Sequence, residues 1–130
     1  MAPETRPTPF AYSILQVVPC IQRNERLNAG VALFCRQLGY LELKAALPAE
    51  KLRLIAPEAD LDDIAGRLEE ITRIVRGDAT GGALANIEPS DRFGWLVAPS
   101  STIIQATPAH TGMTTDPEAE LDRLFARLAG

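Results

Sequence analysis

The sequence has one histidine, His110, and two cysteines, Cys20 and Cys35, among its 130 residues. A single histidine excludes a histidine-rich metal site within one chain, and the spacing of the cysteines matches no zinc-ligand pair. Two cysteines are also too few for the disulfide framework of a small secreted domain. We therefore expect two buried free thiols in a reducing compartment, with no metal and no cofactor.

Long apolar runs are absent as well, since no stretch approaches the 18 residues of a membrane-spanning helix. The first ten residues, MAPETRPTPF, have proline and glutamate where a secretory signal needs a basic patch followed by an apolar stretch. These absences predict a cytoplasmic protein that does not interact with membranes.

The motifs of common catalytic sites are missing too. The chain has no GxxxxGK[ST] phosphate loop, no GxGxxG, no GxSxG elbow and no HExxH pair. A Ser-His-Asp triad could be assembled from Ser100 or Ser101 with His110, but no local motif supports it. We assign no catalytic residue, and an enzyme is the less favoured class.

The net charge of −4 disfavours nucleic-acid binding, which needs a basic face to neutralise phosphates. The charge is uneven: residues 1–56 carry +3 and residues 57–130 carry −7. This asymmetry permits a local anion site in the first half, but acidic helices in the second half would also produce it.

The chain is 46% hydrophobic and 23% charged, which is typical of a folded protein, and its length fits one domain. We expect a disordered tail over residues 1–9 and a single α+β domain over residues 10–130. Residues 10–18, 27–35 and 40–47 have the β-branched and alternating apolar pattern of three strands in an antiparallel meander. Gly30 within the second strand indicates a bulge or a close backbone approach.

Helical spacing appears later in the chain. Apolar residues repeat at i, i+3 and i+4 between an Asp60 cap and Gly77, and again after Asp116. The predicted fold is a mostly antiparallel four-stranded sheet, the meander plus one later strand, packed with these two main helices. The remaining predicted segments are a short helix over 48–56, a linker over 78–82, a helix over 91–97 capped by Ser90, a strand over 102–107 and a loop over 108–115.

Two polar segments could bind a ligand. Residues 23–28 place guanidinium, carboxylate and amide groups before a strand, and residues 100–112 combine hydroxyl groups with the single histidine. The first segment could equally be a solvated loop with a local ion pair from Glu25 to Arg23 or Arg26, and the hydroxyls of the second could satisfy backbone groups. The candidate binding residues are Arg23, Glu25, Arg26, Asn28, Ser101, Thr102, Gln105 and His110.

Several stretches carry a resemblance to a known family: YSILQVVP (12–19), ERLNAGVALF (25–34), APEADLD (56–62), STIIQATPAHTG (101–112) and DPEAELDRLF (116–125). On these residues the chain resembles the bacterial family called domain of unknown function 3037. The family commonly has arginine where this chain has Ser100, so an anion-binding role of that position is in doubt here. The resemblance implies no established activity. Members are often encoded beside HipA-like kinases, which implies such a kinase as a partner.

Two functions follow as hypotheses. The missing motifs and the implied kinase neighbours favour a non-catalytic protein-binding or regulatory module, with a homo-oligomer left open. The alternative is a small enzyme or an anion- or phosphate-ligand binder that uses both polar segments, which requires that they converge at one end of the sheet.

Overall fold

The computed structural model describes residues 6–100 and 102–129. The sheet strands within them are β1 (Thr8–Val17), β2 (Leu27–Cys35), β3 (Tyr40–Ala45), β4 (Ile104–Ala106) and β5 (His110–Thr114). All pairings are antiparallel, in the order β3-β2-β1-β4, and β5 also pairs with β1. The expected α+β fold and the meander of β1, β2 and β3 are confirmed.

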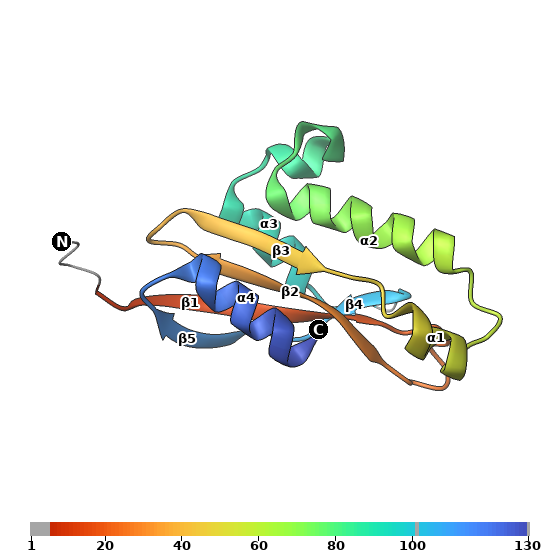
Figure 1. The fold of residues 1–130 in the computed structure, drawn as a ribbon. Coiled ribbons are helices and arrows are strands. Elements are labelled where there is room, and N and C mark those ends of the chain that lie inside the picture. The colour runs from red at the N-terminus through yellow and green to blue at the C-terminus, as the bar shows by residue number, and fades with distance from the viewer. Residues whose placement is uncertain (1–5, 101, 130) are drawn as a thin grey trace.

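Helices cover both faces of the sheet (Figure 1). Helix α2 (Leu61–Arg76) packs on one face together with α3 (Pro89–Val97), and α4 (Pro117–Leu128) packs on the other over β2 and β3. The short helix α1 (Ala49–Ile55) follows β3. None of the helices in the described segments is both long and apolar enough to span a bilayer.

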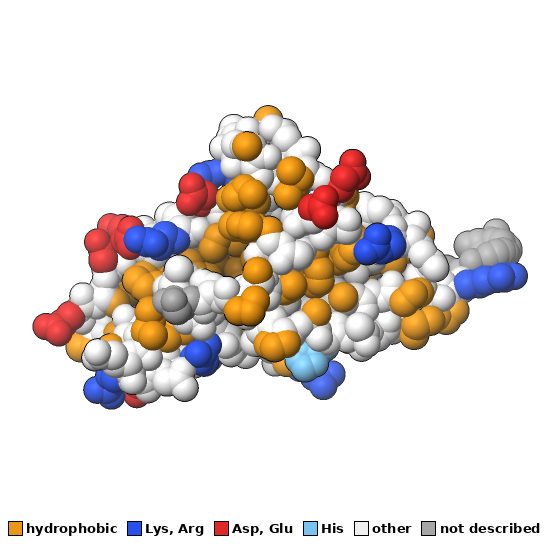
Figure 2. All heavy atoms as spheres, turned by 180° about the vertical axis from the view of Figure 1, so that it is seen from behind, with side chains coloured by type: hydrophobic (Ala, Val, Ile, Leu, Met, Phe, Trp, Pro, Cys, Tyr) orange, Lys and Arg blue, Asp and Glu red, His pale blue; other side chains and the backbone are white. Residues whose placement is uncertain are grey.

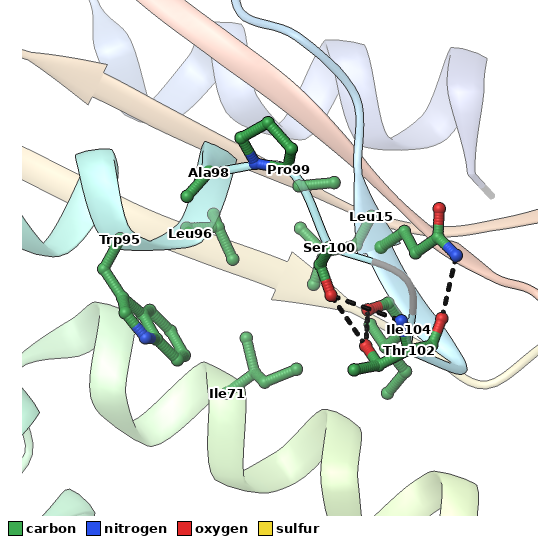
Figure 3. Close-up of a pocket in the computed structure, with 11 residues that line it drawn as sticks. Leu15, Ile71, Trp95, Leu96, Ala98, Pro99, Ser100, Thr102 and Ile104 are labelled. Atoms are coloured by element: carbon green, nitrogen blue, oxygen red, sulfur yellow. Dashed lines mark hydrogen bonds between the residues drawn. The ribbon is translucent and has the colours of Figure 1, made fainter.

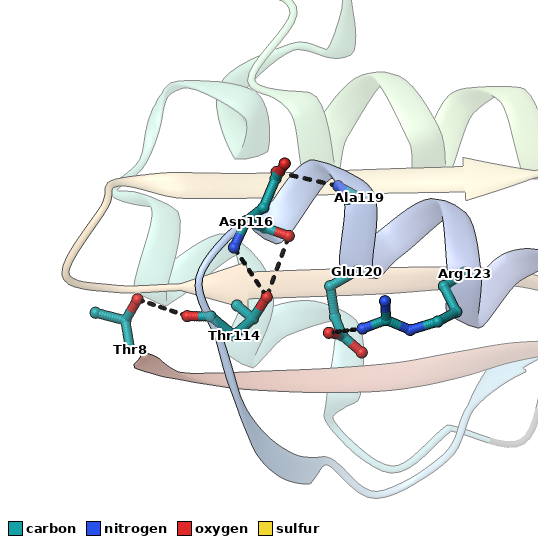
Figure 4. Close-up of polar contacts among 6 residues, drawn as sticks. All are labelled: Thr8, Thr114, Asp116, Ala119, Glu120 and Arg123. Carbon is teal, nitrogen blue, oxygen red and sulfur yellow. Dashed lines mark hydrogen bonds and ion pairs between the residues drawn. The ribbon is translucent and has the colours of Figure 1, made fainter. Parts of the chain in front are cut away.

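Local sequence accounts for the two main helices. The Asp60 carboxylate accepts the Asp63 N–H at the start of α2, and Gly77 ends that helix with a φ of 74°. The Asp116 carboxylate accepts the Ala119 N–H at the start of α4, where Pro117 occupies the first turn (Figure 4).

Two clusters of buried side chains fill the interior. The larger one lies between the sheet and α2 and α3, and it includes Leu15, Leu43 and Ile64. The smaller one lies under α4 and includes Leu33 and Leu121. The sheet therefore buries apolar side chains on both faces, which explains the nearly continuous apolar sequence of β1 and β2.

Gly30 confirms the expected irregularity. Residue pairing between β1 and β2 slips by one residue beside it, and a β-carbon at Gly30 would lie 2.9 Å from the Ala45 β-carbon of β3. Glycine is needed here because β3 approaches too closely for any side chain.

Several expectations were wrong. The sheet has a fifth strand, β5, where residues 108–115 were expected to form a loop. The expected linker over 78–82 contains the short 3-10 turn Ala79–Gly81, a second turn follows at Ala83–Asn86, and α3 begins after Glu88 without a side-chain cap from Ser90. Cys35 is buried as expected, but Cys20 is exposed, because it lies in the turn after β1 instead of within a strand.

The predicted tail over residues 1–9 overlaps the sheet. Residues 1–5 lie outside the described residues, and β1 begins at Thr8, whose hydroxyl donates to the Thr114 carbonyl oxygen over 3.1 Å. This bond is possible only because β5 pairs with the start of β1, a contact between segments about a hundred residues apart in sequence. The assignment of residues 10–130 to one domain stays a prediction.

Candidate functional site

Two side chains of the first polar segment, Arg23 and Glu25, pair with each other. Arg23 donates from Nε and a terminal nitrogen to both carboxylate oxygens of Glu25, at 2.9 and 3.3 Å. The hydrogen bond from Arg23 lowers the pKa of Glu25, and the same bond raises the pKa of Arg23. Both side chains are well exposed, so this pair matches the local ion pair that the sequence left open as an alternative to a site.

Arg26 joins the two polar segments. Its Nε donates to the Asn24 side-chain oxygen over 3.0 Å, and its Nη1 donates to Gln105 Oε1 over 3.0 Å. Asn28 donates to the Leu128 carbonyl oxygen over 2.9 Å, which fixes the C-terminal end of α4 to β2. Two of the predicted site residues, Arg26 and Gln105, are therefore in direct contact, and Asn28 lies two residues further along β2.

The hydroxyl-rich segment mostly satisfies its own backbone. The Thr102 hydroxyl donates to the Ile104 carbonyl oxygen over 2.7 Å, and the Gln105 amide donates to the Thr102 carbonyl oxygen over 2.9 Å (Figure 3). The predicted site residue Ser101 lies outside the described residues. These bonds hold the connection into β4 in a tight turn, as Ser and Thr often do in irregular segments.

His110 is far from this contact. It pairs with Tyr12 across β1 and β5, and its ring centroid lies 5.3 Å from that of Tyr12. Arg26 adjoins Leu27, which pairs with Val17 at the C-terminal end of β1. Four residues lie between Tyr12 and Val17, so these two pairing positions are roughly 17 Å apart along β1, and no hydrogen bond joins His110 to the contact of Arg26 with Gln105 among the described residues.

A groove that the sequence analysis did not identify lies beside β4. It has a volume of about 320 Å³ and is bounded by α2, by the end of α3, by residues 98–100 and by residues 102–106 (Figure 3). Its apolar lining comes from four separate parts of the chain, namely Leu15, Ile71, Trp95, Leu96 and Ile104. Ser100, Thr102 and Gln105 supply polar groups to the lining, and none of the residues that line it is charged.

Trp95 is the most exposed large side chain of this groove. It retains 36% of its surface, whereas Phe93 and Leu96 on the same helix are buried. Figure 2 shows apolar side chains gathered around a hollow on this face of the molecule. The helical period of the sequence could have revealed that Trp95 is exposed. Trp95 lies about 200° from Phe93 around the helix axis and cannot share its buried face.

A second hollow, of about 470 Å³, lies next to Arg26. Its lining includes Arg26, Asn28, Glu50 and Lys51, together with the C-terminal end of α4 at Leu128. Among the described residues, no cluster of three or more histidine, cysteine, aspartate or glutamate side chains could hold a metal ion. Among the described residues, the charged and amide side chains that line this hollow are Arg26, Lys51, Glu50 and Asn28.

The fold and these surfaces define an α+β protein with a sheet covered by helices on both faces and an uncharged groove at its β4 side. Over residues 12–129 the chain matches the family described as protein of unknown function (DUF3037), and it belongs to that family. Searches of the curated proteins and of the solved structures find no match to the chain.

Proposed function

We propose that this protein is a non-catalytic protein-binding module, and that the groove beside β4 accepts an apolar side chain from a partner protein. The observation that supports the proposal is the half-open, uncharged groove with Trp95 at its edge. A partly exposed tryptophan next to an apolar hollow is typical of residues that dominate protein interfaces.

The chemistry of the groove favours a protein over a small charged substrate. Because no Asp, Glu, Lys, Arg or His lines it, the groove offers neither a counter-charge nor a general acid or base. Leu15, Ile71 and Ile104 instead offer apolar surface, which an inserted leucine or phenylalanine side chain would remove from water.

The partner that we propose is a HipA-like kinase, the neighbour implied by the family resemblance. Trp95 is the only tryptophan of the chain, so protein labelled with 5-fluorotryptophan gives one fluorine resonance that reports on the groove. Adding a purified HipA-like kinase from the same organism should shift or broaden this resonance in a saturable manner. The Ile71→Asp variant should weaken the binding at least tenfold, since it places a charge in an apolar contact.

Leu54→Asp is the matched control, because Leu54 is 83% exposed on α1 and does not line the groove. It should bind the kinase as the unaltered protein does. A fluorine resonance that stays unchanged at saturating kinase, or equal affinities for both aspartate variants, would refute the groove as the binding site.

A second candidate function rests on the hollow beside Arg26. Arg26 and Lys51 both line the hollow of about 470 Å³ and could bind a phosphate group, against the charge of Glu50. Inorganic phosphate and nucleotides are the probes for a thermal-shift screen, in which ligand at 100 times its dissociation constant should add about 2.7 kcal/mol of stability.

Arg26→Gln should abolish any such shift. Arg23→Gln is the control, because the Arg23 guanidinium already binds Glu25 and lies outside this hollow. Equal responses of the two variants would show that the anion binds elsewhere.

A further inference from the structure

The two edges of the sheet differ in how they are protected. At the β3 edge, the Arg76 guanidinium donates to the Leu43 carbonyl oxygen over 3.2 Å and pairs with Glu42 at 3.0 Å. Lys44 adds a further charge on the same strand, where it pairs with Asp122 of α4. Charged side chains along an edge strand prevent it from pairing with another chain, so the β3 edge is closed to strand addition.

The edge formed by β5 has none of this protection. No Asp, Glu, Lys or Arg occurs between Arg92 and Asp116, and β5 itself contains no proline. In Figure 1, β5 runs along the outer margin of the sheet with no element beyond it. Within the described residues, β1 is the only strand that pairs with β5.

The pairing with β1 shows which backbone groups of β5 point outward. Ile14 of β1 accepts the Thr107 N–H over 2.9 Å, and Val18 donates to the Ile103 carbonyl oxygen over 2.6 Å. Even-numbered residues of β1 thus form their backbone hydrogen bonds toward β4 and β5. Because these bonds alternate along an antiparallel ladder, Phe10 and Tyr12 bond to β5 in the same way. Their partners on β5 are Gly112 and His110.

Thr111, which lies between His110 and Gly112, and Met113, which lies between Gly112 and Thr114, therefore turn their N–H and C=O groups away from the sheet. β5 is held firmly in this position. Thr8 bonds its last residue, Thr114, and the Thr114 hydroxyl accepts the Asp116 N–H at the start of α4 over 3.1 Å (Figure 4). A rigid strand with free outward groups is a ready template for another strand.

Apolar side chains accompany the free backbone groups. Met113 keeps 60% of its surface exposed. On the same face of the sheet lies a mainly apolar hollow of about 290 Å³, lined by Pro9, Phe10, Ala11, Phe34 and Thr111 together with the polar side chains of Arg36 and Gln37. Two copies of such a surface are complementary, because each offers an exposed methionine that fits the apolar hollow of the other.

We propose that β5 pairs antiparallel with β5 of a second copy of this chain and joins the two sheets into one. The two-fold axis passes at Gly112, so that Thr111 of each copy exchanges backbone hydrogen bonds with Met113 of the other, and each Met113 packs toward the hollow of the other copy. A two-fold axis brings identical residues together, so like charges along this edge would repel. Residues 93–115 contain no Asp, Glu, Lys or Arg, so β5 itself brings no such pair of like charges together.

Sedimentation equilibrium of the full chain tests this pairing. The apparent mass should rise toward that of a dimer as the concentration increases, because a short strand interface gives a reversible dimer. Met113→Lys, which adds a charge to an exposed position, should keep the protein monomeric over the same range. Leu54→Lys is the matched control, since Leu54 is also exposed but lies on α1, and it should dimerise normally.

Amide hydrogen exchange tests the register. The exchange of the Thr111 and Met113 amides should slow as the protein concentration rises, while that of other exposed amides stays constant. A monomer at all concentrations, or a dimer that persists in Met113→Lys, would overturn the proposal. So would a dimer in which the Thr111 and Met113 amides exchange as fast as in the monomer. The groove beside β4 is a separate surface, so none of these results depends on kinase binding.

Discussion

Alanine in place of Gly30 should destabilise the protein, because the added β-carbon would meet two atoms that cannot move away easily. It would lie 2.9 Å from the Ala45 β-carbon and 2.9 Å from the Lys44 carbonyl oxygen. Both contacts belong to β3, which pairs with β2 at this point through Gly30 and Ala45. Relief requires the two strands to separate or shift locally.

The expected loss combines two terms. Inserting a methyl group into a filled space costs about 1–3 kcal/mol. Alanine also restricts the unfolded chain more than glycine does, and this effect stabilises the folded state by about 0.4–1 kcal/mol. The net loss in the free energy of unfolding should be about 1–2 kcal/mol, which lowers the melting temperature by roughly 4 °C per kcal/mol.

Gly66→Ala is the matched control of opposite sign. Gly66 lies in the exposed middle of α2, and a β-carbon there would meet no atom within 4 Å. Alanine in a helix interior is favoured over glycine by about 1 kcal/mol. The same chemical change should therefore stabilise the protein at residue 66 and destabilise it at residue 30.

Urea denaturation followed by circular dichroism measures both variants. Equal m-values would show that the folded and unfolded states keep their exposed surfaces, so that the shift in midpoint reports stability alone. Should Gly30→Ala prove as stable as the unaltered protein while Gly66→Ala gains stability, the close approach of β3 to β2 would be refuted.

Three further predictions follow. Burial, followed by the nearby carboxylates, raises the pKa of Tyr40 to about 12 from its ordinary value of 10. Because the folded state then holds this proton more tightly than the unfolded state, the free energy of unfolding should fall between about pH 10 and pH 12. Urea titrations of Tyr40→Phe should lack this part of the fall. Thr107→Val should cost about 1–3 kcal/mol and speed the amide exchange of Ile14, because the Thr107 hydroxyl accepts the Ile14 N–H over 3.0 Å; unchanged exchange would contradict this. Asp60→Ala should cost about 1 kcal/mol in thermal unfolding by removing the α2 cap, and an unaltered melting temperature would show that the cap contributes nothing.

Much of the fold could be predicted because its signals are local. Helix α2 lies between the predicted cap Asp60 and the predicted end at Gly77, since capping and the 3.6-residue period both act within a few turns. Strand β2 has the predicted bounds, 27–35, for a similar reason: its apolar, β-branched run is bounded by polar turns. The strand β5 was missed because HTGMT has little apolar character, and only pairing with β1 makes it a strand.

The candidate site was harder to predict than the fold. The sequence indicated Arg26 and Gln105 separately, but their contact joins positions 79 residues apart and depends on β4 pairing beside the bulged end of β1 and β2. His110 was grouped with them because it is close to Gln105 in sequence. The connection over residues 107–109 instead leads into β5, where His110 pairs with Tyr12 in the middle of β1.

The sequence by itself determined where most helices and strands begin and end, because caps, prolines and apolar periods act over a few residues. Tertiary structure alone decided which strand forms the unprotected edge and which side chains surround the groove. Leu15, Ile71, Trp95 and Ile104 come from four segments whose proximity no local pattern encodes. Strand pairing and helix packing bring them together, since each buried face needs an opposing apolar surface from elsewhere in the chain.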